Sequence, residues 1–244
     1  MIPPLPSYPS RWTPRARGGF LSIPAILLTA GLLLAADPGT PSASPASSLP
    51  QVETIVCIRH GEKPKEGLGN LDAEGLNRAL ALPEVLVSRY GKPAFIFAPD
   101  PGADQIAEGP VGSDGKRENV CYIRPLLTIG PTAILCRLPV NTLYGFKHIG
   151  PLEGELDKPL YRNALVFVAW EHFQAENFMR NVVRDHGGIP DDVPVWARTD
   201  FDSIYVARIS RNAAGHVSVG FQVDHEGLNG LSDKFPKAAG TGAP

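Results

Sequence analysis

Two histidines occupy positions where chemistry is commonly done in α/β proteins. Arg59 and His60 come directly after an apolar run at residues 54–58, and His172 follows a second apolar run at residues 164–170. Ligands of open α/β sheets bind at the carboxyl ends of the strands. If the two runs form neighbouring strands, we expect both imidazoles to face one pocket.

The residue types around these histidines suit phosphoryl transfer. A neutral imidazole is a competent nucleophile near neutral pH, which makes His60 a candidate. Attack on phosphorus requires the phosphoryl oxygens to be neutralised, and arginine does this through paired hydrogen bonds. Arg59 adjoins His60, and Arg124, which follows a long polar loop at residues 102–119, can reach the same edge. With a protonated His172 as a further donor, these side chains predict a phosphate pocket.

Hydrophobic periodicity predicts the helices that must position these residues. One helix is expected after Asp72, which can cap it, up to Gly91, with Pro83 kinking or breaking it. Two others are expected from Pro125 to about Leu138 and over residues 173–185. A short acidic helix falls within residues 152–160.

Six segments have the apolar or alternating pattern of β-strands. They are residues 54–58, 94–98, 140–144, 164–170, 203–209 and 217–223. The last two are joined by a turn at residues 212–215 and read as a hairpin. Strands that alternate with helices predict an α/β fold: a three-layer α/β/α sandwich with a mostly parallel central sheet and a C-terminal antiparallel hairpin.

The composition is that of an ordinary globular protein. The chain has 244 residues, of which 43% are hydrophobic and 20% charged, and its net charge of −2 gives no reason to expect a nucleic-acid partner. Lys63 and Lys65 are expected to be solvated loop charges that can attract anionic substrates. Three cysteines do not make a disulfide framework: Cys57 is expected to be a buried thiol, and pairing of Cys121 with Cys136 stays open.

The first fifth of the chain differs from the rest. Residues 1–36 combine a basic start with an apolar run at residues 20–36, as in a secretory signal peptide, although an uncleaved membrane anchor is an alternative. Residues 37–50 form a Pro/Ser-rich linker, residues 51–236 the folded domain, and residues 237–244 a flexible tail. We therefore expect an exported protein, periplasmic or secreted, with membrane attachment through residues 20–36 as the open alternative.

The motif Arg59-His60-Gly61 at a strand end resembles the R-H-G motif of the histidine phosphatase superfamily, which includes cofactor-dependent phosphoglycerate mutases. Residues 71–79, L-D-A-E-G-L-N-R-A, are similar to that family's L-T-x-x-G-x-x-Q-A segment, with Asp72 and Arg78 as the departures.

The resemblance continues in the order of the later residues and covers roughly residues 53–185. Arg124 stands where the family's second arginine precedes a helix containing T-A, here at residues 132–133. His172 stands where the second histidine follows a buried strand. In the mutase-like subgroup an S-x-L-x-R-A stretch follows the second strand; here residues 97–101 replace it, and the arginine is displaced to Arg124.

The resemblance implies a covalent route without a metal or other cofactor. His60 would attack the phosphoryl group and form a phosphohistidine, while Arg59, Arg124 and His172 bind the phosphoryl oxygens, with Gly61 also at the substrate. A carboxylic acid would protonate the leaving oxygen, and water would then hydrolyse the intermediate.

The proton donor is the open position. Glu171 is the first candidate because it neighbours His172, but adjacent strand residues point to opposite faces, so it serves only if the strand has ended before it. Glu62, Asp100 and Asp114 are the alternatives.

The function expected from the sequence is an exported phosphatase that hydrolyses a small phosphomonoester through a phosphohistidine on His60. A phosphate-binding protein that keeps the pocket but lacks an effective acid is the first alternative, and a phosphomutase is the second. The sequence leaves the substrate's identity and the oligomeric state open.

Overall fold

The computed structural model describes residues 50–236. The expected signal or anchor, nearly all of the linker and the expected tail lie outside the described residues, so these assignments stay predictions. Within the described part, no helix combines the length and apolarity needed to cross a membrane.

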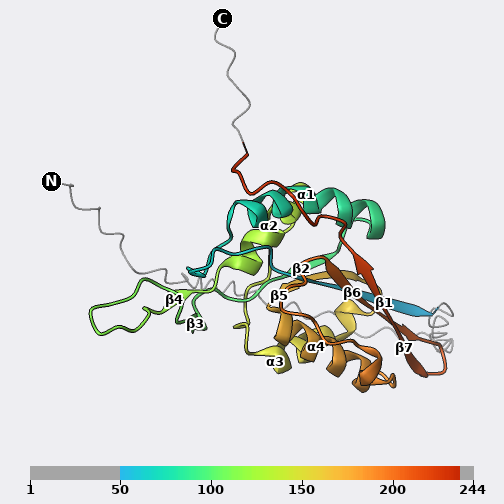
Figure 1. Ribbon diagram of the computed structural model, residues 1–244. Coiled ribbons are helices and arrows are strands. Elements are labelled where there is room, and N and C mark those ends of the chain that lie inside the picture. The colour runs from blue at the N-terminus through green and yellow to red at the C-terminus, as the bar shows by residue number, and fades with distance from the viewer. Residues whose placement is uncertain (1–49, 237–244) are drawn as a thin grey trace, which may run out of the picture. The chain divides into compact units, whose positions relative to one another are not determined.

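A five-stranded sheet, in the order β2-β5-β1-β6-β7, forms the middle of the domain (Figure 1). Strands β2, β5 and β1 run parallel to one another, while β6 and β7 are antiparallel additions. The bounds are β1 Gln51–Arg59, β2 Phe95–Phe97, β5 Leu165–Trp170, β6 Ser203–Arg211 and β7 Val217–His225. The parallel sheet with a C-terminal antiparallel hairpin is thus confirmed.

Helices cover both faces of this sheet, which confirms the three-layer sandwich. Figure 1 shows α1 (Ala73–Tyr90) and α2 (Arg124–Cys136) on one face, and α3 (Ile149–Leu156) and α4 (His172–Asp185) on the other. Two short 3₁₀ turns lie at Pro159–Tyr161 and Pro190–Asp192.

The residues of β1 divide between the two layers because side chains alternate along a strand. Ile55 and Cys57 pack into the core under α3 and α4, whereas Val56 and Ile58 pack into the core under α1 and α2. Both faces of β1 are therefore apolar, as expected for a central strand of a covered parallel sheet.

Helix α1 follows its predicted signals closely. The Asp72 carboxylate accepts a hydrogen bond from Gly75 N at its start, and Gly91, with a φ of 89°, ends it. Pro83 lies inside one continuous helix rather than breaking it in two. Gly75 is required by packing, because a Cβ there would lie 2.3 Å from the carbonyl oxygen of Glu62.

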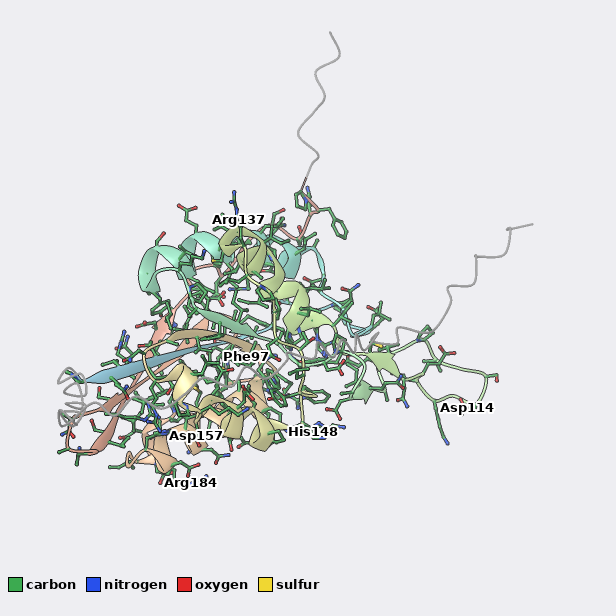
Figure 2. All side chains as sticks on the ribbon, turned by 180° about the vertical axis from the view of Figure 1, so that it is seen from behind. Phe97, Asp114, Arg137, His148, Asp157 and Arg184 are labelled. Atoms are coloured by element: carbon green, nitrogen blue, oxygen red, sulfur yellow. The ribbon has the colours of Figure 1, made fainter. Side chains whose placement is uncertain are left out.

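Two segments differ from the sequence predictions. Residues 102–119 were expected to be one loop, but β3 (Gln105–Ile106) and β4 (Val120–Cys121) pair there, and Figure 2 shows Asp114 at the far end of this excursion. Residues 140–144 form no strand and make only an isolated bridge from Asn141 to Phe97, which leaves β2 as an edge. Cys57, Cys121 and Cys136 are all free thiols.

Candidate active site

His60 follows the last residue of β1 and is almost completely buried. Its backbone N–H donates to the carbonyl of Trp170, the last residue of β5, at 3.1 Å. Its ring Nδ1 lies 2.7 Å from the carbonyl oxygen of Gly61. A carbonyl can only accept, so Nδ1 carries the proton and Nε2 keeps its lone pair.

The protonation state of His60 suits a nucleophile. Burial lowers the pKa of its imidazole well below the ordinary value, and the positive charges of Arg124 and Arg59 lower it further. The ring is therefore neutral near neutral pH. Within residues 50–236 no protein group hydrogen-bonds to Nε2, so the lone pair remains free to attack.

A cavity of about 310 Å³ opens beside His60. Its wall includes the predicted residues Arg59, Arg124, Glu171 and His172. The sheet explains this meeting, because β1 and β5 are parallel neighbours in which Arg59 stands opposite Trp170. The residues that follow the two strands therefore emerge side by side.

Besides lining the cavity, Arg59 binds the loop that precedes β6. Its Nη1 donates to the backbone carbonyls of Arg198 at 2.8 Å and Asp200 at 2.7 Å, and its guanidinium lies 3.9 Å from the centre of the Phe201 ring. Burial lowers its pKa to about 10, so it remains charged near neutral pH. Arg59 thus anchors the loop that precedes β6 while its Nε has no hydrogen-bond partner.

Arg124 is the first residue of α2 and is held by groups that the sequence did not point to. Its Nη1 donates to Oε2 of Glu108 at 2.5 Å, and its guanidinium lies 4.5 Å from the centre of the Tyr122 ring. Glu108 also pairs with Lys63 at 2.8 Å. Burial opposes the ionised form of Glu108, but Arg124 and Lys63 outweigh it and hold its pKa at about 2.

Glu171 and His172 sit at the start of α4 rather than on the strand. Strand β5 ends at Trp170, and the Glu171 carboxylate caps α4 by accepting from Gln174 N at 3.0 Å. His172 Nδ1 lies 2.5 Å from Oε1 of Glu171, although the pair lacks hydrogen-bond geometry. Burial raises the pKa of Glu171, but His172 and the N–H of Gln174 lower it by more. The net pKa therefore lies below the ordinary value, and the carboxyl is ionised.

Several donors in the cavity wall have no acceptor. In the described part of the chain, Arg59 Nε, Arg124 Nε and the Tyr122 hydroxyl are buried without a hydrogen-bond partner. Burial raises the pKa of Tyr122, so its phenol stays protonated and can only serve here as a neutral donor or acceptor. A buried polar group without a partner costs about 1–3 kcal/mol, so an acceptor that reaches these covered atoms would offset that cost.

The fixed charges of the cavity favour an anion. Arg59, Lys63, Arg124 and Arg198 line it, against the carboxylates of Glu108 and Glu171. Cations outnumber carboxylates even when His172 is neutral, and a cleft lined by one sign of charge attracts the opposite one. Lys63, expected to be a solvated loop charge that attracts anions, is exposed and also lines this cavity.

The other predicted acids and Gly61 lie elsewhere. Glu62 pairs with Arg78, Asp100 accepts from Gly102 N at 2.8 Å, and Asp114 lies at the end of the β3–β4 excursion. Gly61 donates its N–H to Thr128 Oγ1 at 2.9 Å, so its backbone orients His60 and does not face the cavity. The prediction that Gly61 contacts substrate has no support in this geometry.

The cavity also contains residues that were not predicted. They are Ile106 and Glu108 from the β3–β4 excursion, Tyr122 directly after it, Phe146, and Arg198 and Phe201 from the loop before β6. Only the long length of residues 102–119 could have hinted at the first two, because long loops in compact domains are often functional.

Arg78 ties the loop after His60 to the C-terminal hairpin. It is fully buried, donates to both carboxylate oxygens of Glu62, and donates to Glu226 at 2.6 Å. Asp202 lies 3.7 Å from the same guanidinium. The Arg78 guanidinium thus lies within 4 Å of three acidic side chains. Burial raises the pKa of Glu226 to about 8, although Arg78 opposes this shift.

This raised pKa predicts how stability depends on pH. Between pH 4.5 and about 8 the folded chain keeps the Glu226 proton while the unfolded chain has lost it, so the free energy of unfolding falls as pH rises. The slope contributed by one proton is on the order of 1 kcal/mol per pH unit. Urea unfolding of the protein and of Glu226→Gln across this range measures it. The difference in the free energy of unfolding between the protein and Glu226→Gln should change with pH by that slope. A difference that does not change with pH would contradict the prediction.

The pairing of Glu108 with Arg124 predicts an effect on anion binding. Glu108→Gln removes a carboxylate that competes for Arg124 and Lys63, so inorganic phosphate should bind about 5-fold tighter, or roughly 1 kcal/mol. Isothermal titration calorimetry measures this. Glu118→Gln, an exposed position on the same excursion, is the matched control and should leave affinity unchanged. Weaker phosphate binding in Glu108→Gln would contradict the competition.

Comparisons with known proteins add a distant likeness. The sequence matches no family model and no curated protein. Among solved structures, one from Nakamurella multipartitia, described provisionally as the phosphohistidine phosphatase SixA, is 16% identical with a TM-score of 0.44, covering 71% of this chain and 96% of its own. A second, from Agrobacterium tumefaciens and described in the same provisional terms, is 11% identical with a TM-score of 0.37, covering 70% and 97%. Likeness at this level carries no argument about function, which must come from the site.

Proposed function

We propose that this protein is a phosphatase of the histidine phosphatase type, which transfers a phosphoryl group to His60 and then to water. One observation carries the proposal: a neutral imidazole with a free Nε2 faces a cationic cavity whose wall holds unpaired donors on Arg59, Arg124 and Tyr122. A phosphoryl group supplies the negative charge and the acceptor oxygens that this wall lacks.

In the first step, the phosphoryl oxygens take up the cations of the cavity, and Arg124 exchanges Glu108 for the substrate. His60 Nε2 then attacks phosphorus, an N–P bond forms, and the bond to the leaving oxygen breaks with the electron pair on that oxygen. The Gly61 carbonyl, 2.7 Å from Nδ1, stabilises the positive charge that develops on the ring.

In the second step, water attacks the phosphohistidine from the side that the leaving group has vacated. The N–P bond breaks, inorganic phosphate departs, and His60 returns to the neutral form that its burial favours. Glu171 is the carboxylate of the predicted set that lines the cavity, so it is the group placed to accept the proton of the attacking water.

Export remains part of the proposal on sequence grounds alone. Residues 1–36 would act as a signal peptide or anchor, and the mass of the protein recovered from outside the cytoplasm distinguishes the two. A mass that includes residues 1–36 would rule out cleavage.

The decisive experiment is to trap the phosphoenzyme. The full chain is mixed with acetyl phosphate carrying ³²P, quenched rapidly, and the label is tested for acid lability and alkali stability before mass spectrometry assigns its position. We expect the label on His60. Turnover with no label, or with label on another residue, would refute the covalent route, and phosphate binding without turnover would favour the alternative of a non-catalytic binding protein.

Tyr122 offers a test in which activity and stability move in opposite directions. Tyr122→Phe removes a donor for the phosphoryl group, so kcat/KM should fall roughly 10-fold. Because that hydroxyl is buried without a partner, the free energy of unfolding should stay the same or rise by about 1 kcal/mol. Steady-state kinetics and urea unfolding measure the two.

Tyr161→Phe is the matched control for this pair of measurements. Its hydroxyl donates to Glu155 at 2.8 Å, remote from the cavity wall, so its loss should lower stability and leave kcat/KM unchanged. Unchanged kcat/KM in Tyr122→Phe would contradict a contact between that hydroxyl and the substrate.

A further inference from the structure

We propose that a second cleft, next to the catalytic cavity, binds an aromatic leaving group, and that the substrates are therefore small aryl phosphates. This rests on the proposed function. We call this region the leaving-group cleft. Its volume is about 720 Å³, and its apolar wall consists of Phe146, Phe173, Val195 and Trp196.

The leaving-group cleft continues the catalytic cavity. The two share Phe146, Glu171, His172 and Arg198 in their walls. A phosphoryl group held beside His60 therefore directs its ester oxygen toward a space that already exists. The cavity of about 310 Å³ and the cleft of about 720 Å³ each have a volume within the range of small-molecule sites.

The wall of this cleft is apolar where a surface is normally polar. The side chain of Phe173 is 58% exposed and that of Val195 is 74% exposed, and both face the cleft. Neighbouring exposed apolar side chains in a hollow indicate a binding surface. A flat aromatic ring buries such a surface well, whereas the hydroxyl groups of a sugar or polyol would lose water without gaining partners.

One acidic group of the cleft, the Glu176 carboxylate, is already occupied. Glu176 accepts from Arg180 at 3.1 Å and from the backbone N–H of Trp196 at 2.8 Å, which uses both of its carboxylate oxygens. Glu176 therefore offers little to the hydroxyl groups of a polyol. The positive charges of Lys147 and Arg198 lie at the cleft and suit an electron-rich ring or a phenolate.

The chemistry of the cavity selects the same leaving group. Both carboxylates that line it have a lowered pKa: Glu108 pairs with Arg124 and Lys63, and Glu171 caps α4 beside His172. Neither is a protonated acid that could donate to a departing alkoxide. A phenolate needs no such donor, because the ring stabilises its charge. The P–O bond breaks, the phenolate leaves with the electron pair and takes a proton from solvent, and the N–P bond to His60 forms.

The test compares substrates that differ in the leaving group alone. The full chain is assayed with 1-naphthyl phosphate, with glycerol 2-phosphate, and with acetyl phosphate, whose leaving group is labile but has no ring. We expect kcat/KM for naphthyl phosphate to exceed that for glycerol phosphate by at least 10-fold. Phe173→Ser and Val195→Ser should each lower kcat/KM for naphthyl phosphate about 5- to 10-fold and leave acetyl phosphate turnover within 2-fold. Ile134→Ser, an exposed apolar position on α2, is the matched control.

Each outcome is informative about one claim. Equal losses for naphthyl and acetyl phosphate, no loss for naphthyl phosphate, or a preference for glycerol phosphate would overturn the cleft assignment and leave phosphohistidine chemistry standing. A phosphotyrosyl peptide used with higher kcat/KM than naphthyl phosphate would replace small aryl phosphates by a polypeptide substrate. If neither acetyl nor naphthyl phosphate is turned over or labels His60, the proposed function fails, and the cleft assignment fails with it.

Discussion

Replacing His60 with alanine is expected to reduce turnover by roughly 10⁴-fold or more, because the nucleophile that accepts the phosphoryl group is lost. Arg59 and Arg124 remain in the variant, so affinity for inorganic phosphate should change little. Steady-state kinetics with acetyl phosphate and calorimetric titration with phosphate separate these two effects. His148→Ala, at an exposed histidine, should behave as the unchanged protein.

Free imidazole provides the stringent form of this test. The side chain of His60 is buried beside a cavity of about 310 Å³, so its removal leaves a space that imidazole can enter. We expect added imidazole to restore part of the turnover of His60→Ala and to leave as phosphoimidazole. Rescue identifies a chemical role, because a variant that is merely misfolded gains nothing from imidazole. Substantial residual turnover in His60→Ala without imidazole would refute the nucleophile assignment.

Replacing Arg78 with methionine is expected to lower the free energy of unfolding by about 3–5 kcal/mol. The substitution leaves the carboxylate of Glu62, 2.6 Å from Arg78, without its cation, and it leaves the buried carboxyl of Glu226 without its donor at 2.6 Å. Burial itself opposes the charge of Arg78, but the Glu62 and Glu226 carboxylates outweigh it and raise its pKa, so the charge is permanent. Urea unfolding followed by circular dichroism measures the loss.

Two further variants decide whether the loss comes from uncompensated charge. Arg184→Met, which breaks an exposed pair with Asp185, should leave the free energy of unfolding nearly unchanged. Adding Glu62→Gln and Glu226→Gln to Arg78→Met should recover part of the stability, because the stranded Glu62 charge is then gone and the Glu226 carboxyl is replaced by an amide that cannot ionise. If the triple variant is less stable than Arg78→Met, packing rather than charge explains the effect.

The cluster around Arg78 also links stability to the site. Glu62 follows Gly61 directly, and Gly61 holds the ring of His60 through its carbonyl. We therefore expect a folded Arg78→Met, studied at low temperature, to lose kcat more than phosphate affinity. The family motif that this chain resembles has glutamine at the position of Arg78. The charged cluster around Arg78 therefore departs from that motif.

Much of the fold could be predicted because its signals are local. The central strands are short runs of apolar residues, α1 begins at a capping aspartate and ends at a glycine, and the C-terminal hairpin alternates with period two. The failures have a local origin as well. Residues 140–144 have a strand-like composition, but Pro139 precedes them and only Asn141 pairs with β2.

The sequence by itself determined which residues stand at the strand ends. Arg59, His60 and His172 follow directly from where apolar runs stop, and their meeting follows from β1 and β5 being parallel neighbours. Such placement depends on periodicity along one segment, which sequence records. The sequence left the acid undecided for the same reason, since the end of β5 at Trp170 could be known only to within a residue or two.

Only the tertiary structure decided what surrounds the nucleophile. Glu108 and Tyr122 reach the cavity because the β3–β4 excursion packs over it, and Arg59 is anchored by backbone carbonyls at residues 197–200, far along the chain. These contacts join loops whose conformations depend on how separate helices and strands pack. The sequence of one loop does not indicate which distant loop it will contact. The neutral state of His60 is likewise a product of burial among two arginines, which only the folded chain provides.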